Sequence, residues 1–538
     1  MSEPYDAIIA GAGSIGLWVA SEVALTGARV LVLERDTEND SDWKLLPLGL
    51  RGVSMQSLET LHRRDMLSRV VENQNNTSKL TFTGHFSGIR FPISRVELER
   101  FPYLILGPSV WTTITSLYEF TEVMLGRAKE LGVEVRRGHT VVGVDQDENG
   151  VTVQTTKTGS PDTKEEFRGK WLVGCDGGRS AVRHFAGFKF EGSEAKGTWY
   201  RAQCDIQNSD KLSRGMVPGN GGLYARLSDL IPQKDLPNMR LPGETLVFVD
   251  FDGGAYDRSG ELTHEHLQSV FERISGDPSI KITKVYVSHT FTDRSKQATS
   301  YRQDRVLLAG DACHIHPPVG GQGLNLGIGD AMNLGWKLGA VIRAEKQSGG
   351  RVTPSQLALL DSYEKERRPV GEQLLEYTRA QTAVLVPDAH GNAMYNIIKD
   401  VIENTTEGLH YFVARSWGLQ IHYDVSDAGS ATDLAAKPHP LAGRTAPDFE
   451  FEDGIRLGPK LKSGNGLIVD FGRNEKLREL IDEGKFEDRI HYLALGAKKT
   501  CGLGALIVRP DGFVAWAVDE GKEVDLDAAK KALGKWFI

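Results

Sequence analysis

The N-terminal segment carries the pattern that most constrains the fold of this chain. An apolar run over Tyr5–Ala10 leads into Gly11-x-Gly13-x-x-Gly16, and a helical stretch and a second β-rich run follow over Leu17–Leu25 and Arg29–Leu33. This order predicts a βαβ unit with two parallel strands and a tight glycine turn before the helix. In such a unit the first glycine permits the turn, the second lets a pyrophosphate approach, and the third allows close packing of helix on strand.

The turn ends at a helix N-terminus, where free N–H groups and the helix dipole favour an anion. We therefore predict a dinucleotide site built from Gly11, Gly13, Ser14, Ile15 and Gly16. Glu34 closes the second strand, where its carboxylate can accept hydrogen bonds from ribose hydroxyls. A glycine turn without a ligand is the alternative, and the register of strand, helix and acidic residue favours the site.

Composition narrows the class of protein. A chain of 538 residues is expected to form two to four domains, and its 40% hydrophobic and 25% charged residues are typical of a globular protein. The net charge of −8 argues against a nucleic-acid partner. Four cysteines without a CxxC pair favour a reducing compartment over disulfides or zinc. Neither a signal peptide nor an apolar run of about 18 residues is found, so we expect a cytoplasmic protein without a membrane segment.

A second motif joins a strand to a glycine-rich turn. The strand predicted over Val306–Ala309 runs into Gly310-Asp311, and a turn over 317–323 opens a helix expected over Leu324–Ala344. Asp311 can bind a ribityl or ribose hydroxyl. The N–H groups at the helix start suit a flavin's pyrimidine oxygen, which becomes anionic on reduction. A structural loop is the alternative. His314 and His316 have no third ligand nearby, so no metal site is predicted.

A third motif, Asp176-Gly177-Gly178-Arg179-Ser180, follows another predicted strand and by itself also fits a simple turn. Together the three motifs resemble those of the single-component flavin monooxygenases, the aromatic hydroxylase family that includes p-hydroxybenzoate hydroxylase and phenol hydroxylase. The resemblance covers Tyr5 to about Glu372, with Asp330-Ala331-x-Asn333-Leu334-x-Trp336-Lys337 and Glu366-Arg367-Arg368-Pro369 as further matches. The tail resembles the thioredoxin-like C-terminal domain of the phenol hydroxylase branch through Val508-Arg509-Pro510-Asp511-Gly512, but without a CxxC pair it is expected to be redox-inactive.

The resemblance implies an α/β fold with three parts. A Rossmann-like FAD-binding domain, residues 1–83, 113–187 and 301–436, is interrupted by a β-sheet substrate domain, residues 84–112 and 188–300. Residues 437–538 would form the thioredoxin-like α/β domain, which either caps the FAD domain or mediates a homodimer.

The resemblance also implies positions for the cofactors. FAD would lie extended, with its adenosine end at the first motif, Glu34 and Arg35, while Asp176 serves both FAD and NAD(P)H. Arg51 is a candidate flavin contact, and the remaining expected contacts are Gly310, Asp311, Pro318, Gly321, Gly323, Leu324 and Asn325. NADPH or NADH would reduce a flavin that swings outward, and O2 would then give a flavin hydroperoxide that an electron-rich ring attacks.

A base or cation near a phenol would make its ring more nucleophilic. Our catalytic candidates are His85, Arg201, Tyr224 and His289, and further substrate-side candidates are Trp111, Tyr200, Arg226 and Phe291. For each aromatic residue a place in the sheet core is the alternative, and for each Arg or His a solvated position. The absence of any general base also stays open.

We therefore predict an FAD-dependent monooxygenase that hydroxylates a small phenolic or polycyclic aromatic substrate with NAD(P)H and O2. Epoxidation or Baeyer–Villiger oxygen insertion on a natural product stays open, because one flavin peroxide serves all three reactions. An uncoupled NAD(P)H oxidase and a non-catalytic flavoprotein are further alternatives. A halogenase is disfavoured, because the chain has no Trp-x-Trp sequence.

Overall fold

The computed structural model describes residues 3–71, 81–109, 112–230, 241–425 and 438–538. Its largest sheet has eight strands in the order β18-β19-β10-β1-β2-β7, with β8 and β9 folded back beside β10. Neighbours from β19 to β7 along this order pair in parallel. The strands are β1 (Tyr5–Ala10), β2 (Val30–Glu34), β7 (Glu134–Arg137), β8 (His139–Asp147), β9 (Gly150–Lys157), β10 (Ser160–Gly174), β18 (Arg302–Gln303) and β19 (Val306–Leu308).

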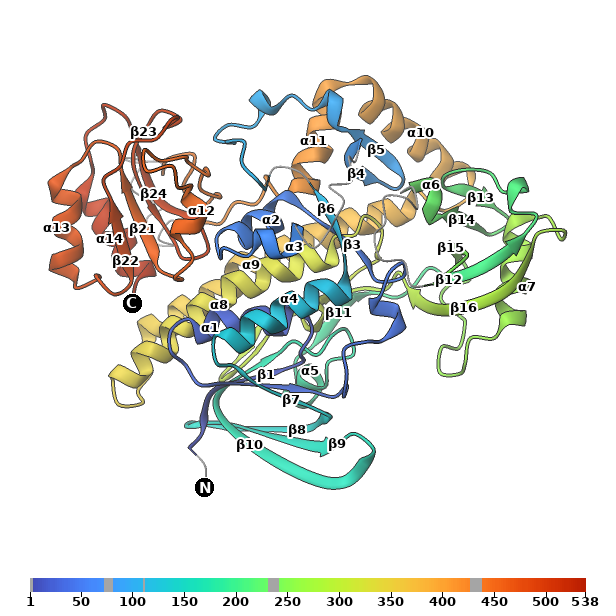
Figure 1. The fold of residues 1–538 in the computed structure, drawn as a ribbon, viewed down its shortest axis with the longest axis horizontal. Helices are drawn as coiled ribbons and strands as arrows, with labels where there is room; N and C mark the ends of the chain where they lie inside the picture. The colour runs from blue at the N-terminus through green and yellow to red at the C-terminus, as the bar shows by residue number, and fades with distance from the viewer. Residues whose placement is uncertain (1–2, 72–80, 110–111, 231–240, 426–437) are drawn as a thin grey trace.

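Three helices lie together on one face of this sheet: α1 (Ser14–Ala24), α4 (Leu117–Glu130) and α8 (Gly323–Gln347) (Figure 1). α1 is buried at every position except Ile15, because the sheet, α4 and α8 enclose it. Trp18 of α1 stacks on Phe120 of α4 with ring centroids 6.4 Å apart. β1, α1 and β2 thus form the predicted βαβ unit, and the predicted helix after the second motif is confirmed as α8.

A second sheet of five antiparallel strands has the order β13-β14-β15-β12-β16. Its strands are β12 (Thr198–Gln207), β13 (Val217–Gly219), β14 (Gly222–Arg226), β15 (Glu244–Asp250) and β16 (Lys281–Thr292). One face packs on helix α7 (His264–Ser275) through Tyr200, Phe248 and Tyr224. Residues alternate between faces along a strand, so Trp199 and Val249 lie on the opposite face. There they pack against Val319 and Leu385, which belong to the eight-stranded sheet and its helices, here called the first unit.

The hairpin of β4 (Phe82–Phe86) and β5 (Ile89–Pro92) forms its own two-stranded sheet. It packs on α9 (Pro354–Ala383), α10 (Ala389–Asn404) and α11 (Thr406–Trp417) through an apolar cluster that includes Phe86, Phe91 and Trp417. The predicted substrate domain places residues 84–112 with the five-stranded sheet. The hairpin instead buries its apolar side against the helices that follow α8.

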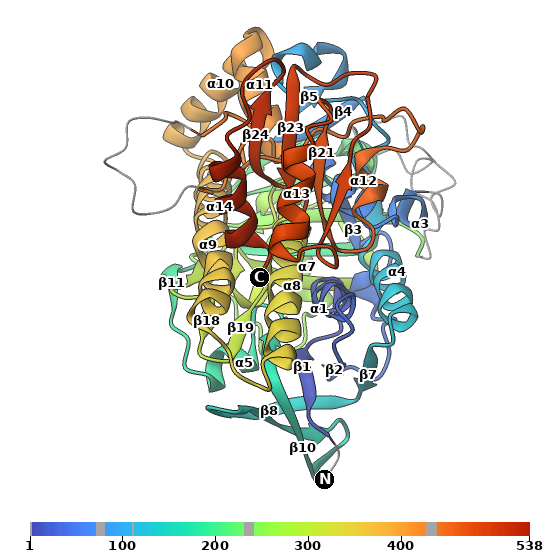
Figure 2. The same ribbon diagram turned by 90° about the vertical axis from the view of Figure 1, so that its left-hand side faces the viewer.

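The C-terminal segment forms a four-stranded sheet in the order β22-β21-β23-β24. It comprises β21 (Gly466–Asp470), β22 (Ile490–Leu493), β23 (Leu503–Val508) and β24 (Val514–Asp519), with helices α12 (Leu457–Lys460), α13 (Glu475–Gly484) and α14 (Leu526–Trp536). Trp336 and Ala340 of α8 share an apolar cluster with Leu533 and Trp536 of α14, so this segment packs directly on α8 (Figure 2). The predicted domain boundary at 436–437 lies outside the described residues.

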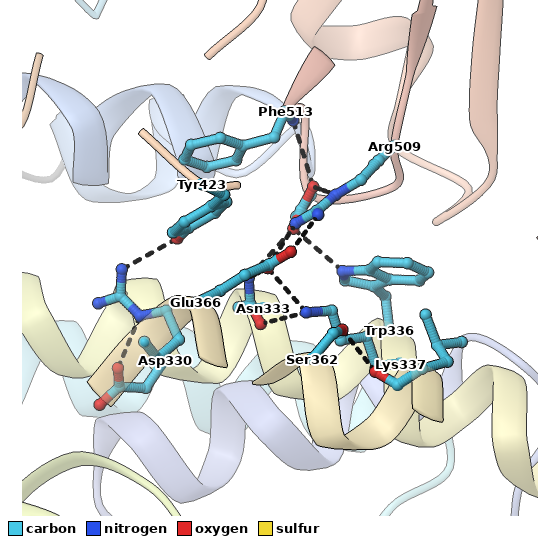
Figure 3. A network of polar contacts seen from close by, with 12 residues as sticks. Asp330, Asn333, Trp336, Lys337, Ser362, Glu366, Tyr423, Arg509 and Phe513 are labelled. Atoms are coloured by element: carbon cyan, nitrogen blue, oxygen red, sulfur yellow. Dashed lines mark hydrogen bonds and ion pairs between the residues drawn. The ribbon is translucent and has the colours of Figure 1, made fainter. Parts of the chain in front are cut away.

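A buried network of charges joins the C-terminal segment to α8 and α9 (Figure 3). Glu366 accepts hydrogen bonds from Lys337 at 2.7 Å and from Arg509 at 2.6 and 3.0 Å. Arg509 also pairs with Asp511, and Asn333 donates to Glu366 at 2.6 Å. Two cations and two carboxylates therefore neutralise one another where side-chain exposure is 3% or less.

The network sets the ionisation of Glu366. Burial alone would raise its pKa, but the charges of Arg509 and Lys337 and the hydrogen bonds donated by Arg509 and Asn333 hold the pKa at about 2. The folded pKa lies below the unfolded value, so this carboxylate stabilises the fold above pH ~4.5 and the contribution is lost as pH falls toward 2.

Breaking the network from one side leaves buried charges without partners. We expect Arg509→Met to lower the free energy of unfolding by about 3–5 kcal/mol, because Glu366 and Asp511 stay buried without their cation. Urea titration followed by tryptophan fluorescence measures the change. Lys530→Met is the matched control, because its partner Glu483 is exposed, and it should cost less than ~1 kcal/mol. Equal effects of the two substitutions would contradict this account.

Candidate functional site

The glycines of the first motif have two different roles. Gly11 has φ +105°, and a Cβ there would lie 2.5 Å from the Cys175 carbonyl oxygen. A Cβ at Gly16 would lie 2.0 Å from the carbonyl oxygen of Gly11, so both glycines are required for packing. A Cβ at Gly13 would meet no protein atom within 4 Å. Gly13 therefore borders open space at the start of α1, a cradle that a larger side chain would begin to fill.

The start of α1 leaves its backbone donors to that space. Gly13 caps the helix without a side-chain hydrogen bond, so the first N–H groups of α1 have no cap. The Ser14 hydroxyl instead shares a hydrogen bond of 2.8 Å with Thr121, and Ile15 packs beneath Gly310. Ser14 and Ile15 can therefore contribute backbone N–H groups to an anion while their side chains hold the surrounding structure.

Two carboxylates flank the turn. Glu34 accepts the Ala12 N–H at 2.7 Å and the Asp36 N–H at 2.9 Å, which fixes it at the end of β2 beside the glycines. Asp176 follows β10, and one of its oxygens accepts the Val182 N–H at 3.0 Å. The other oxygen, Oδ1, is buried without a hydrogen-bond partner, and burial raises the Asp176 pKa. An unsatisfied buried acceptor beside an open cradle fits a hydroxyl-bearing ligand.

Arg35 lies differently from these carboxylates. Its side chain is 69% exposed and contacts Asp36 at 3.3 Å. At the end of β2 it can contact a bound adenosine only from the solvent side.

The second motif lies near Arg51. Gly310 has φ +64° and rests on Ile15, and Asp311 beside it is exposed. Burial lowers the pKa of the Arg51 guanidinium, and the charge of Asp311 acts in the opposite direction. Arg51 lies on β3 (Leu50–Val53), which pairs with β6 (Thr113–Ser116), and it donates to the carbonyls of Leu48 and Leu50.

The glycine-rich turn forms the start of α8. Gly320 and Gly321 have φ +85° and +65°, and a Cβ at Gly321 would meet no atom within 4 Å. Asn325 accepts the Ser54 N–H at 2.8 Å and donates to the Gly52 carbonyl at 3.0 Å, so its side chain joins α8 to β3. Pro318 is exposed beside the turn, Gly323 contacts His316, and Leu324 packs against the main core. The backbone at Gly321 is therefore open to a ligand.

A cavity of about 210 Å³, here called the His85 cavity, lies against this turn. It is lined by Gly320, Gly321, Phe82, His85, Leu227 and Ile114, among others. His85 accepts the Gly88 N–H at Nδ1 (3.2 Å), so its proton is on Nε2. Burial, together with the charge of Arg90, lowers the His85 pKa to about 4. His85 is therefore neutral at pH 7, and its Nε2–H is the ring group that can donate a hydrogen bond.

Arg201 and His289 lie opposite each other on β12 and β16. Arg201 donates to the Pro47 carbonyl at 2.8 Å, and its Nε is buried without a partner. Burial, with the neighbouring charge of Arg51, lowers the Arg201 pKa to about 9. Burial and the charges of Arg258, Arg179 and Arg51 lower the His289 pKa. Arg201 thus places a cation, with His289 beside it, on the face of the five-stranded sheet that packs against the first unit.

Tyr224 is not part of this group. It packs against Phe271 of α7 on the other face of the sheet, and its hydroxyl accepts the Ser213 N–H at 3.3 Å. Tyr200 lies on the same face and bonds His266 at 2.9 Å, while Arg226 pairs with Asp229. Phe291 stacks on Trp199 on the cation-bearing face, with ring centroids 6.0 Å apart. Trp111 lies outside the described residues.

The two histidines of the second motif have structural partners. His314 is bonded to Asp330 at 2.6 Å, and His316 contacts the Pro317 carbonyl at 2.7 Å. Within the described ranges, no cluster of three or more His, Cys, Asp or Glu side chains is arranged to hold a metal ion. Over the same residues, no helix has the length and apolar character required to cross a membrane.

Comparison with known proteins agrees with this geometry. Residues 4–378 match the family model described as FAD binding domain, and residues 439–537 match that of the aromatic-ring hydroxylase C-terminal region. The chain is 37% identical to a monooxygenase of Claviceps purpurea over 99% of this chain and 97% of that one. It is 34% identical to the 12-dehydrotetracycline 5-monooxygenase/anhydrotetracycline 6-monooxygenase of Streptomyces rimosus, over 99% of both chains.

A solved structure shows the same likeness. The anhydrotetracycline hydroxylase of Streptomyces rimosus superposes with a TM-score of 0.80 at 31% identity, covering 99% of each chain. The chain therefore belongs to the FAD-dependent aromatic-ring hydroxylases and is an FAD-dependent aromatic monooxygenase.

The sequence analysis did not identify two residues of α9 that lie near the glycine-rich turn. Gln381 of α9 is buried beside Gly320 with both amide atoms unpaired, and Tyr377 has a buried hydroxyl without a partner. Both lie outside the motifs from which the site was predicted. Their helical spacing of four residues places them on one face, but no motif signals their proximity to the turn.

The Gly13 cradle gives a direct test of FAD binding. We expect Gly13→Ala to fold normally, because its Cβ meets no protein atom, and to bind FAD at least ~10-fold more weakly, because the methyl group enters the phosphate space. Flavin fluorescence titration of the apoprotein measures the Kd. Gly126→Ala in α4, where a Cβ is equally unobstructed, should leave the Kd unchanged. Unaltered FAD binding by Gly13→Ala would exclude this cradle as the phosphate site.

Proposed function

We propose that FAD lies extended from Gly13, Glu34 and Asp176, past Arg51 and Asp311, to the turn at Gly320–Asn325. The observation that carries this proposal is the series of open or unsatisfied groups along one path. It begins at the Gly13 cradle and the unpaired Asp176 Oδ1 and ends at the glycine-rich turn that borders the His85 cavity. Bound FAD would supply the redox chemistry with which NADPH or NADH and O2 hydroxylate an aromatic ring.

The residues around the turn prepare a positive environment for the flavin ring. The N-terminus of α8 presents backbone N–H groups and the positive end of the helix dipole. Arg51 and Arg201 add guanidinium groups that donate hydrogen bonds to carbonyl oxygens. These groups favour negative charge at the pyrimidine end of the ring.

The nicotinamide donor would use Arg179 and Arg258, two cations near His289 of β16. Burial and the charges of these arginines lower the His289 pKa, so the positive charge belongs to the two arginines. Such a concentration of positive charge fits the phosphates of NADPH or NADH.

The substrate would be a phenolic or polycyclic aromatic compound in the His85 cavity. Phe82, Ile114 and Leu227 provide apolar walls, and His85 can donate its Nε2 proton to an oxygen of the substrate. This hydrogen bond would orient a phenol or favour its ionised form. The similar protein of Streptomyces rimosus is named an anhydrotetracycline hydroxylase, which supports a polycyclic substrate.

We extend the proposal to the architecture of the chain. The FAD-binding unit would be interrupted by the five-stranded substrate sheet, and the C-terminal segment would be thioredoxin-like. The parallel pair β21–β22 and the antiparallel strands β23 and β24 support this assignment. Cys501 is the single cysteine of this segment, so it cannot form an internal dithiol.

The decisive experiment is oxidation of NADPH and NADH in air by the FAD-loaded protein with a panel of phenols. We expect at least one two- to four-ring phenol to accelerate oxidation and to give a product that is heavier by one oxygen atom. Liquid chromatography with mass spectrometry detects the product. Equal oxidation rates with every compound, with hydrogen peroxide as sole product, would sink the hydroxylase proposal.

The pH dependence of kcat/KM tests the role of His85. Because its pKa is about 4, His85 does not titrate above pH 6, and it should contribute no ionisation near pH 6.5 to the kcat/KM profile. His85→Leu should lower kcat/KM by roughly 10-fold through loss of the donated hydrogen bond, and His85→Gln should restore most of it. An ionisation near pH 6.5 that vanishes in His85→Leu would show instead that His85 is a base.

A further inference from the structure

A separate cavity lies where the C-terminal segment meets the rest of the chain. It is here called the Arg444 cavity, has a volume of about 510 Å³ and lies between α2 (Met55–His62), residues 101–109 and residues 440–448. It shares no lining residue with the His85 cavity, and none of the residues proposed to face FAD borders it. The Arg444 cavity is therefore distinct from the proposed flavin and substrate sites.

The walls of the Arg444 cavity are mainly apolar. Phe101, Leu104 and Leu419 belong to the apolar cluster of α9, α10 and α11. Tyr103 and Ile105 pack instead against the core of the C-terminal segment, so the cavity lies where two cores meet. A water molecule needs about two to four polar partners, which such walls do not supply. An apolar ligand would provide the packing contacts that side chains facing a void lack.

One cation of this cavity has no carboxylate partner. The two carboxylates that line the cavity are both paired. Glu59 accepts a hydrogen bond from Arg63 at 2.8 Å, and Asp448 accepts one from a second arginine, Arg456, at 2.5 Å. Arg444 is half-buried, and within the described ranges its guanidinium makes no hydrogen bond or ion pair with another residue. This guanidinium is therefore available to an anion.

The loop of residues 101–109 adds two further features. Ser109 lines the cavity at 6% exposure, and among the residues that the structure describes its hydroxyl has no hydrogen-bond partner. Tyr103 has φ +66°, a left-handed conformation that a bulky side chain rarely adopts. Such strained residues are concentrated at functional sites, where the surrounding structure holds them in place.

We propose that the Arg444 cavity binds a monocarboxylic acid with an apolar body. The carboxylate accepts two parallel hydrogen bonds from the Arg444 guanidinium and a further one from the Ser109 hydroxyl. The apolar body lies against Leu104, Ile105 and the aromatic side chains of the loop. A phosphate fits poorly, because a second negative charge would be buried without a cation, and a neutral ligand leaves Arg444 unpaired. This inference is independent of the proposed hydroxylation.

The test compares two ligands that differ in charge. Decanoate is the acid, and decan-1-ol is the neutral molecule with the same chain. Isothermal titration calorimetry on the FAD-loaded full chain measures both Kd values. Arg444→Met removes the cation, Ser109→Ala removes the hydroxyl, and Leu104→Trp fills part of the cavity. Arg473→Met is the matched control, because this arginine of the C-terminal segment is 68% exposed and outside the cavity.

We expect the unaltered protein to bind decanoate at least ~10-fold more tightly than decan-1-ol. Arg444→Met should raise the Kd for decanoate by about 10-fold or more, the effect of losing a hydrogen bond to a charged group, and change the Kd for decan-1-ol less than ~2-fold. Ser109→Ala should raise the Kd for decanoate by roughly 3-fold. Leu104→Trp should weaken both ligands by more than ~10-fold through steric exclusion, and Arg473→Met neither.

Thermal unfolding and FAD content show which variants are folded, and if Leu104→Trp is not, Arg444→Met and Ser109→Ala decide. Equal affinities of the unaltered protein for the two ligands, or an unchanged Kd for decanoate in Arg444→Met, would overturn the proposal. Full binding of decanoate by folded Leu104→Trp would place the acid in another cavity and overturn it as well. An equal loss in Arg473→Met would reveal a general effect of charge, which also contradicts a specific site.

Discussion

Four buried charges hold the helix on which the candidate site depends. Lys337 of α8, Glu366 of α9, and Arg509 with Asp511 at the end of β23 neutralise one another at side-chain exposures of 3% or less. If any of these groups moved away from its partners, a charge would stay unpaired in a region of low dielectric constant. The C-terminal segment therefore fixes α8 and α9 relative to each other, and α8 carries this rigidity to its N-terminus at the glycine-rich turn.

A second group of contacts extends this control to the Gly310–Asp311 turn. Arg367 of α9 is hydrogen-bonded to Asp330 of α8 at 2.8 Å. Asp330 in turn bonds His314 at 2.6 Å and accepts the Gly310 N–H at 3.3 Å. Both segments proposed to face the flavin are thus attached to the same helix, so their spacing depends on α8 and little on loop conformation. A site held within fractions of an ångström requires this kind of support.

Cations that pair with carboxylates and arginines that donate to carbonyl oxygens lie in different parts of the molecule. In the α8–α9 network every described cation has a carboxylate within hydrogen-bonding distance. Arg51 and Arg201, which border the proposed flavin position, donate to carbonyl oxygens. Burying these guanidinium groups costs free energy that a negatively charged ligand can recover. This contrast separates residues that stabilise the fold from residues available for binding, although both groups are arginines.

The sequence by itself determined where the glycine turn and the start of α8 lie, and that Glu34, Asp176 and Asp311 each follow a strand. These features depend on local spacing within single strand–turn–helix units. The tertiary structure decided which faces meet. Strand alternation alone could not show that Arg201 faces the first unit while Tyr224 faces α7, because this depends on which side of the sheet α7 covers. The Glu366–Arg509 pair joins residues 143 positions apart, and the Arg444 cavity lies between α2, residues 101–109 and residues 440–448. Burial and hydrogen-bond satisfaction arise from such long-range contacts, which no local pattern encodes.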